Sequence, residues 1–510
     1  MPRRRQSQTK SPPLGDLLQQ RHYPASAGID ISATEAVVAV APERSVPWQG
    51  NAAPVRTFQL YTGGLHALRD WLRACGITTV AMESTGNFWI CLYEVLEAAG
   101  LEVWLVNARH VKNVAGRKTD VCDAQWLQQL LQAGLLKKSF RPSREIVGLR
   151  TLMRYRAHLL QQASAALVAA QRTLVECNLR LHHVLSDLDG RSGQVMVEAI
   201  LAGERDPRTL AKLRDPRCRT PEAEVVAALE GEYRDEQLFI LGEHWAVWKA
   251  ARQALVRCDA KLAAVLQPKA ARPAAEPAGA PEKPAASEKP AASEKAAASE
   301  KAVASDKPAA ADKAAARPPK AGGAGPAAPR AHKNNFGFDL HRESLGFYGV
   351  DLCTTPGVST STVAVLMSEV GPRQDLLAQF PTAERFCSWL GVNPENQKTA
   401  NKVFATKTKR TSNRLSAALR MAALALGRAR DEMGNFCRRM KGRLGKAEGI
   451  TAVAHKLARV LYAMIKTGQP YDEAQAFALT PRKRSRTLAA LARKAQNLGF
   501  NLVPMTPAKA

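Results

Sequence analysis

Four acidic residues stand where carboxylates could hold a metal ion. Asp30 lies in the apolar run Gly28–Ser32, where an uncompensated charge is costly to bury. Glu83 directly follows the β-branched run Thr78–Met82, so it is expected at the end of a strand. Open α/β sheets place their ligands at strand ends. Taken singly, each acid could instead cap a turn or face solvent.

A second pair of acids, Asp120 and Asp123, is spaced three residues apart in an expected helix over 120–131. Residues at this spacing share a helix face, where two carboxylates repel each other unless a cation joins them. Thr119 is the expected N-cap of that helix. The helix dipole also favours acids in a first turn, so the spacing alone does not distinguish a metal site from an ordinary acidic first turn.

Together the four carboxylates predict a divalent-metal site that acts on phosphodiesters. Hard oxygen ligands suit Mg²⁺ or Mn²⁺. Two such ions can activate a nucleophile and stabilise the leaving oxygen of an in-line displacement, so we expect two ions. A strand acid, a strand-end acid and a helix acid pair are the layout of a ribonuclease H-like nuclease core. Arg117 and Lys118 precede the pair and are expected to hold phosphates.

Residues 23–145 alternate strand and helix patterns that would position these acids. Strands are expected over 27–31, 36–40, 55–61, 78–82 and 103–106. Helices are expected over 64–75, 88–99 and 120–131. An opening run of strands followed by alternation predicts a mixed sheet flanked by helices, an α/β ribonuclease H-like catalytic domain.

The rest of the chain divides by composition. Residues 146–266 carry Leu and Ala at three- and four-residue steps, which predicts long helices and a coiled coil. Residues 267–333 are rich in Ala, Pro, Lys, Glu and Ser, and predict a disordered linker. Residues 334–470 predict a mainly α domain. The ends, 1–22 and 471–510, predict a disordered basic arm and a basic tail.

The formal net charge of +27 predicts a polyanionic partner, for which nucleic acid is the first choice. A solvated basic face is the alternative. The basic residues expected to contact nucleic acid, besides Arg117 and Lys118, are Lys402, Lys407, Lys409, Arg410 and Arg414.

Membrane and secretory segments are not expected. The sequence has no apolar run long enough for a membrane span, and its first residues lack the apolar core of a secretory signal. Its nine cysteines include no C-x-x-C pair, which favours a reducing compartment over disulfides or a zinc site. We therefore expect a cytoplasmic, nucleoid-associated protein that needs no membrane.

Several stretches resemble the insertion-sequence DEDD transposases, a family also described as bridge-RNA-guided recombinases. In the first domain these stretches are Gly28–Ser32, Met82–Asn87 and Gly116–Leu127. In the second half they are Thr355–Val358, Phe386–Gly391 and Ala454–Arg459. The similarity covers 23–266 and 334–470 and is interrupted by the expected linker. Gly116–Leu127 is the longest and most specific of these motifs.

The resemblance implies a RuvC-like first domain with its metal ligands at Asp30, Glu83, Asp120 and Asp123. It also implies DNA as substrate, a structured guide RNA, and a homo-oligomer that is a tetramer on DNA. A serine of the second domain becomes covalently attached to DNA in this family.

The position of that serine falls on Thr399, and two glycines of the family pattern are Ala400 and Asn401. A threonine hydroxyl can act as a nucleophile. Its methyl group restricts the side chain, and loss of both glycines restricts the backbone. Ser412 is the other hydroxyl that could take this role. An ordinary loop or N-cap hydroxyl is the alternative for both.

The sequence therefore predicts an RNA-guided insertion-sequence transposase or recombinase that cleaves and exchanges DNA strands with metal ions. A junction-resolving metal nuclease would use water and need the four acids without Thr399. An inactive, domesticated relative would keep only nucleic-acid binding. An actin-like sugar kinase would need a second phosphate-binding Asp-Gly motif on a later hairpin, which the sequence lacks.

Overall fold

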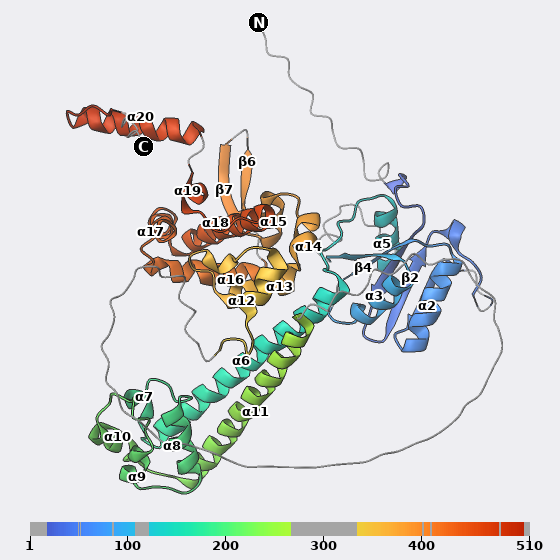
Figure 1. The fold of residues 1–510 in the computed structure, drawn as a ribbon. Coiled ribbons are helices and arrows are strands. Elements are labelled where there is room, and N and C mark those ends of the chain that lie inside the picture. The colour runs from blue at the N-terminus through green and yellow to red at the C-terminus, as the bar shows by residue number, and fades with distance from the viewer. Residues whose placement is uncertain are drawn as a thin grey trace, which may run out of the picture. The chain divides into compact units, whose positions relative to one another are not determined.

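The structure is a computed structural model of the chain, and it describes most of its length. The described residues are 18–48, 50, 53–83, 86–107, 122–266, 334–399, 402–408, 411–478 and 481–503. Within 395–399, 402–407 and 481–484 only the backbone is described. The chain forms two compact units, 1–143 and 144–510 (Figure 1).

The first unit is built on a five-stranded mixed sheet with strand order β3-β2-β1-β4-β5. The strands are β1 (Ser26–Ile31), β2 (Glu35–Val40), β3 (Val55–Gln59), β4 (Thr79–Glu83) and β5 (Glu102–Val106). β1 pairs antiparallel with β2 and parallel with β4, and β4 pairs parallel with β5. The helices are α2 (Thr62–Ala74), α3 (Trp89–Ala98) and α5 (Asp123–Gln132). The predicted mixed sheet flanked by helices is confirmed, and it is compatible with a ribonuclease H-like fold.

The two faces of this sheet carry different helices, because successive strand residues point to opposite faces. Ile29, Val80 and Met82 belong to a core that includes Leu68 of α2 and Leu96 of α3. On the other face, Ala81 and Val106 pack with the apolar side of α5, which is formed by Trp126, Leu127, Leu130 and Leu131. The sheet is therefore buried on both faces.

The second unit begins with two long helices, α6 (Arg144–Glu176) and α11 (Asp235–Leu266), which lie side by side (Figure 1). They run antiparallel, since Ile146 shares a core with Leu262 while Ala170 shares another with Trp245. Four short helices connect them: α7 (Leu181–Val184), α8 (Arg191–Leu201), α9 (Pro207–Lys212) and α10 (Glu222–Leu229). The prediction of long helices is confirmed; a coiled coil stays a prediction.

A buried ion pair fastens the chain after residue 333 to this helix pair. Arg156 of α6 donates to Asp259 of α11 through Nε at 2.6 Å, and its Nη2 also donates to the carbonyl of Asn335 at 2.9 Å. The Asp259 carboxylate accepts the Gly337 N–H at 2.9 Å. Asp259 lies seven residues before the end of α11 at Leu266. The described residues on either side of 267–333 are thus held by the same two helices.

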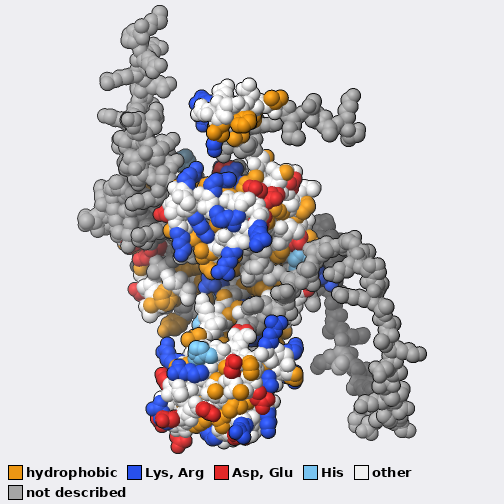
Figure 2. Space-filling view, turned by 90° about the vertical axis from the view of Figure 1, so that its left-hand side faces the viewer, with side chains coloured by type: hydrophobic (Ala, Val, Ile, Leu, Met, Phe, Trp, Pro, Cys, Tyr) orange, Lys and Arg blue, Asp and Glu red, His pale blue; other side chains and the backbone are white. Residues whose placement is uncertain are grey.

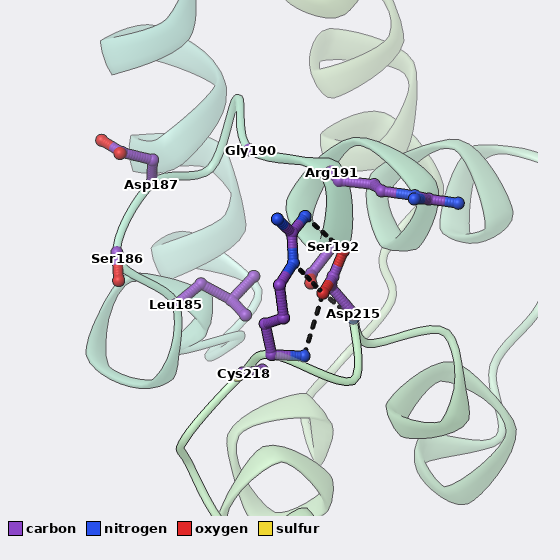
Figure 3. Close-up of a pocket in the computed structure, with 9 residues that line it drawn as sticks. Leu185, Ser186, Asp187, Gly190, Arg191, Ser192, Asp215 and Cys218 are labelled. Atoms are coloured by element: carbon purple, nitrogen blue, oxygen red, sulfur yellow. Dashed lines mark hydrogen bonds and ion pairs between the residues drawn. The ribbon is translucent and has the colours of Figure 1, made fainter. Parts of the chain in front are cut away.

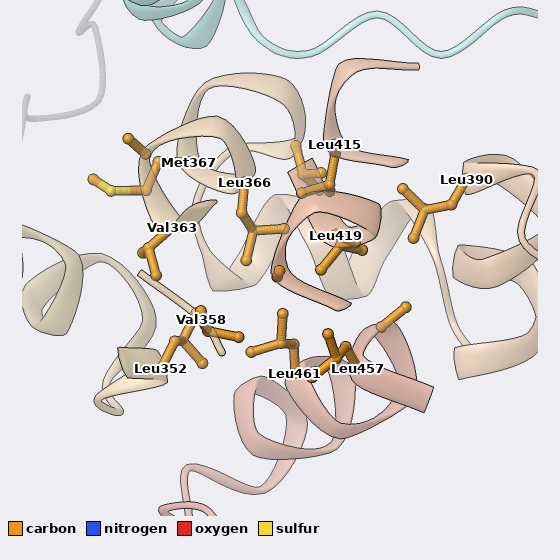
Figure 4. Packing of buried hydrophobic residues seen from close by; sticks show 14 of the residues in the cluster. Leu352, Val358, Val363, Leu366, Met367, Leu390, Leu415, Leu419, Leu457 and Leu461 are labelled. Atoms are coloured by element: carbon orange, nitrogen blue, oxygen red, sulfur yellow. The ribbon is translucent and has the colours of Figure 1, made fainter. Parts of the chain in front are cut away.

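The remainder of the second unit is a helical domain with one hairpin. Its helices are α12 (Leu340–Tyr348), α13 (Thr360–Val370), α14 (Arg373–Gln379), α15 (Ala383–Leu390), α16 (Arg414–Ala425), α17 (Glu432–Leu444), α18 (Lys446–Thr467), α19 (Glu473–Phe477) and α20 (Pro481–Asn497). Leu366, Leu419 and Leu457 from three of these helices meet in its core (Figure 4). The predicted mainly α domain is confirmed.

One element of this domain was not predicted. β6 (Pro394–Thr399) and β7 (Lys402–Thr408) pair antiparallel, with an irregularity between Gln397 and Lys398. Val403–Thr408 is rich in β-branched and aromatic residues (Val403, Phe404, Thr406 and Thr408), which suits a strand. This segment was predicted as part of a mainly α domain because the residues on both sides of it have helical patterns. Thr399 is the last residue of this strand, and its role as the nucleophile stays a prediction.

Two of the predicted disordered segments lie largely outside the described residues. The linker 267–333 is entirely outside them, and so are 1–17 of the basic arm. Leu18, at the described end of that arm, packs against the core under α5. No helix within the described ranges is long and apolar enough to cross a membrane.

Candidate active site

The strand that carries Asp30 lies in backbone contact with α5. A Cβ atom at Gly28 would come within 2.1 Å of the Ala124 carbonyl oxygen and 2.4 Å of the Gln128 nitrogen. Only glycine fits between two backbones this close. The contact fixes where α5 sits along β1.

The direction of α5 follows from a second contact. Tyr23, just before β1, donates its N–H to the carbonyl of Gln132 at the last turn of α5, at 3.1 Å. Gly28, further along the chain, faces the first turn. The helix therefore runs antiparallel to β1. Asp30 is the next residue on the Gly28 face, so it points toward the beginning of α5, where Asp123 is the first helical residue.

Glu83 reaches the same place from the neighbouring strand. Ile29 lies opposite Met82 in the parallel pair of β1 and β4, so the register brings Asp30 beside Glu83, on strands about 4.8 Å apart. Ala81, two residues before Glu83, packs against α5. Glu83 therefore shares the α5 face with Asp30. Asp30 and Glu83 are half-buried and Asp123 is exposed.

The first turn of α5 differs from the prediction. Cys122, not Thr119, is its N-cap: the Cys122 sulfur accepts the Gln125 N–H at 3.4 Å, and the Gln125 side chain accepts the Cys122 N–H at 3.3 Å. This reciprocal pair is a capping box, and it starts the helix at Asp123. The predicted helix over 120–131 therefore begins at Asp123, and Asp120, the other acid of the predicted pair, lies outside the described residues.

The oxygen-only set of side chains at this edge suits a hard divalent cation. Three carboxylates from β1, β4 and α5 are directed to one side of the sheet edge. Within the described part of the chain, no three acidic, His or Cys side chains already form a metal-binding group. Asp120, with the predicted phosphate contacts Arg117 and Lys118, lies outside the described residues.

The second predicted catalytic residue, Thr399, is in the other unit. It ends β6 and lies opposite Lys402, the first residue of β7. Thr399 therefore stands at the turn end of the hairpin. Its side chain is not described, nor are those of Lys402 and Lys407; Ala400, Asn401, Lys409 and Arg410 lie wholly outside the described residues.

The helix after the hairpin begins with an exposed cation. Arg414 is the first residue of α16, and Asn413 caps this helix by accepting the Ser416 N–H at 3.1 Å. Ser412, the alternative nucleophile, is exposed just before that cap. Arg414 and Ser412 are thus accessible to a bound strand.

Further basic side chains cluster on the neighbouring surface of this domain, where Lys and Arg are gathered (Figure 2). The exposed members on and around α17 are Arg428, Arg430, Arg438, Arg439, Arg443 and Lys446. In the part that the structure describes, none of these six forms an ion pair with a carboxylate of the chain. This basic surface, which lies beyond the predicted contact residues, can therefore bind phosphates.

A separate pocket lies among the short helices between α6 and α11 (Figure 3). It has a volume of about 360 Å³ and its lining includes Ser186, Arg191, Asp215 and Arg217. Arg217 donates to both Asp215 oxygens, at 3.0 and 3.1 Å. This hydrogen bonding lowers the pKa of Asp215 to about 2. Asp215 is thus a paired, ionised carboxylate, and we assign it no role in proton transfer.

Two family comparisons match the regions just described. Residues 27–178 match the DEDD transposase domain of the IS110 family, which spans the sheet, α5 and α6. Residues 351–438 match the transposase domain of the IS116/IS110/IS902 family, which includes the hairpin and α16. The chain carries both domains of an IS110-type transposase.

The family predicted from the sequence motifs is therefore confirmed. An IS110-type transposase acts on DNA, so DNA is a partner of this chain. No curated protein matches the chain.

Proposed function

We propose that this IS110-type transposase is a metal-dependent DNA recombinase that uses acidic residues and a hydroxyl as its catalytic groups. Asp30, Glu83, Asp120 and Asp123 hold two Mg²⁺ or Mn²⁺ ions. Thr399 supplies the attacking hydroxyl. The contact of Gly28 with α5 supports the proposal, together with the register of β1 and β4, since Asp30 and Glu83 occupy neighbouring positions on the face that α5 covers.

When bound, the two ions supply Lewis-acid stabilisation of the charge that builds up on the phosphate and on the leaving oxygen. Asp30 and Glu83 hold their oxygens on neighbouring strands, so their spacing is fixed by the sheet. Asp123 is fixed by the first turn of α5. These carboxylates therefore need little rearrangement when substrate binds.

The hydroxyl step transfers the phosphoryl group to the protein. The Thr399 oxygen loses its proton and forms a bond to phosphorus. The bond from phosphorus to the 3′ oxygen breaks, and the 3′ oxygen leaves and takes up a proton. The products are a free 3′ hydroxyl and a 5′-phosphoryl threonine, which keeps the energy of the phosphodiester for rejoining.

Basic residues complete the proposed substrate contacts. Arg117, Lys118, Lys402, Lys407, Lys409, Arg410 and Arg414 contact nucleic-acid phosphates. The net charge of +27 supports such contacts. We further propose that a structured guide RNA directs the choice of target, that the protein acts as a tetramer on DNA, and that it is associated with the nucleoid.

A junction-resolving nuclease that uses water is the main alternative, because Thr399 departs from the serine of the family pattern. An inactive, nucleic-acid-binding relative is another. The two differ from the recombinase in whether DNA is cut and whether it becomes attached to protein.

A covalent-adduct assay separates these three functions. The protein is incubated with end-labelled DNA from the flank of its own element, together with RNA transcribed from that flank, and run on a denaturing protein gel. We expect a labelled adduct with the wild type, more adduct with Thr399→Ser, and none with Thr399→Ala or Asp30→Asn. Undiminished cleavage by Thr399→Ala would support the junction-resolving nuclease that uses water. Absence of cleavage by every protein tested, the wild type included, would support the inactive nucleic-acid-binding relative.

The guide RNA is tested by sequencing nucleic acid that co-purifies with the protein. We expect one structured RNA from the flank of the element. Recovery of DNA together with a random mixture of cellular RNA would contradict RNA guidance.

A further inference from the structure

Helix α20 carries exposed apolar side chains along one side. Leu488, Leu491 and Leu498 follow one another at steps of three and seven residues, which places them in one stripe along a helix. Leu488 and Leu491 are each 47% exposed, and Leu498, directly after the helix, is exposed too. Within the part of the chain that the structure describes, none of the four hydrophobic cores includes a residue of α20. This leucine stripe is therefore left in water in the single chain.

The same helix is strongly cationic. It contains six Lys or Arg residues and no acid, and the sequence has no acid after Glu473. Lys494 borders the leucine stripe three residues after Leu491, and position Arg484 lies four residues before Leu488, on the same side of the helix. Two α20 helices would repel each other through these cations. The best partner for the stripe is therefore both apolar and acidic.

The beginning of α11 offers such a surface. Five exposed residues, joined by steps of three or four, share one side of this helix and form an acidic stripe: Glu236, Phe239, Ile240, Glu243 and Val247. Phe239 is 70% exposed and Val247 is 53% exposed. Among the described residues, neither glutamate is paired with a Lys or Arg side chain. The acidic stripe therefore has both apolar area and charge available for a partner.

The two stripes agree in length as well as in chemistry. At a rise of 1.5 Å per residue, Leu488–Leu498 extends about 15 Å and Glu236–Val247 about 17 Å. The leucines would cover the apolar members of the acidic stripe, while the cations of α20 face its two glutamates. Nucleic-acid phosphates would satisfy the cations alone and leave the leucines in water. A helix with acidic and apolar side chains is thus the better partner.

A second copy of the chain can supply that partner. Both stripes are exposed in the same chain, so neither is covered by the other within it. In a two-fold dimer, each α20 would meet the α11 of the other copy, and the contact would form twice.

We propose that the leucine stripe of α20 packs on the acidic stripe of α11 in a second copy of this chain. Both helices lie outside residues 27–178 and 351–438, which match the two transposase domains. The contact is therefore a property of this chain that the two family domains do not supply. It depends on neither the metal site nor Thr399, so its failure would leave the proposed function untouched.

The test is site-specific crosslinking between two full-length chains that have been freed of nucleic acid by nuclease treatment. A photoreactive benzophenone amino acid replaces Leu491 in an unlabelled chain, which is equilibrated at low salt with a heavy-isotope-labelled chain and irradiated. We expect mass spectrometry to find position 491 joined to residues 236–247 of the labelled chain. Crosslinks to 236–247 of the unlabelled chain alone would overturn the proposal, because α20 would then fold back on its own α11. Absence of any crosslink to α11 would overturn it as well.

Reversing the charges tests the electrostatic part of the contact. Glu236→Lys with Glu243→Lys in the labelled chain should lower the crosslinking yield about tenfold. Arg484→Glu with Lys494→Glu in the photoreactive chain should restore it. A yield that is indifferent to these changes would contradict the proposed pairing.

The apolar part has a matched control on the same helix. Phe239 and Val256 are both 70% exposed on α11, but Val256 lies nine residues after Val247, which places it on the opposite side. We expect Phe239→Ser to lower the yield several-fold and Val256→Ser to leave it unchanged, both with the Tm of the wild type. Equal yields from these two variants would overturn the proposal.

Discussion

Asp30 and Thr399, the two kinds of proposed catalytic residue, stand on very different scaffolds. β1 is a central strand with a neighbour on each side and α5 packed directly on its backbone. Thr399 ends a strand of a two-stranded hairpin, which pairs with no further strand among the described residues. Isolated two-stranded hairpins are marginally stable. We infer that Asp30, Glu83 and Asp123 are positioned by the fold alone, whereas the Thr399 hydroxyl is positioned when nucleic acid binds.

The largest expected effect is the loss of strand cleavage when one of the proposed metal-binding carboxylates is removed. Asp30→Asn removes a charged ligand while keeping the shape of the side chain. We expect strand cleavage to fall about a thousandfold or more, since several kcal/mol of transition-state stabilisation depend on the bound ions. Gel-based cleavage rates would measure this. Asp70→Asn, which changes an acid of α2 paired with Arg69, should leave the rate unchanged; an equal fall in both variants would contradict the assignment.

In the second unit, we expect the buried ion pair of Arg156 with Asp259 to stabilise the fold. Both side chains are buried, at 4% and 6% exposure, so Asp259→Ala leaves a cation buried without its partner. We expect a loss of about 4 kcal/mol in the free energy of unfolding. Urea unfolding would measure it. The exposed pair of Lys249 and Glu198 is the control, and Glu198→Ala should cost less than about 1 kcal/mol.

Gly28→Ala tests whether the contact with α5 builds the acid site. The added Cβ would meet backbone atoms of α5, so we expect a loss of about 3 kcal/mol and weaker metal binding. Gly63→Ala, in α2, is the control because its Cβ would meet nothing within 4 Å. Thermal unfolding would compare the two variants. Equal stability would show that β1 and α5 are not packed as described.

Thr399→Ser is expected to have a smaller effect, in the opposite direction. Removing the methyl group relieves crowding at phosphorus, so we expect the covalent adduct to form several-fold faster. Adduct formation over time would measure this, with Ser412→Ala as the control that should change nothing. If Thr399→Ser forms the adduct no faster than the wild type and Ser412→Ala forms none, the nucleophile is Ser412.

The smallest expected effect is that of removing 267–333. The described residues on either side are held by the same helix pair, through Asp259 and Gly337. A short Gly-Ser bridge from Leu266 to Asn334 should therefore leave Tm and adduct formation unchanged. A large loss of stability would show that this segment is part of the fold.

The sequence predicted most of the sheet because its strands are short runs of apolar and β-branched residues. Asp30 and Glu83 were predicted as ligands of one metal site, and the register of β1 with β4 brings them to neighbouring positions. The start of α5 was mispredicted because Thr119 is a common cap, whereas Cys122 is a rare one that Gln125 completes. The contact at Gly28 joins residues that are distant in sequence, so local patterns could not reveal it. The hairpin at Thr399 was missed because β6 consists of polar residues after Pro394 and lacks the apolar pattern of a strand.

Metal binding to the intact protein is the most direct test of the central claim that the four acids form one divalent-metal site. Mn²⁺ titration followed by electron paramagnetic resonance would count the bound ions in the absence of nucleic acid and with DNA. The account predicts two Mn²⁺ ions with DNA, and loss of both in the double variant Asp30→Asn with Glu83→Gln. Unchanged Mn²⁺ binding in that variant would contradict it.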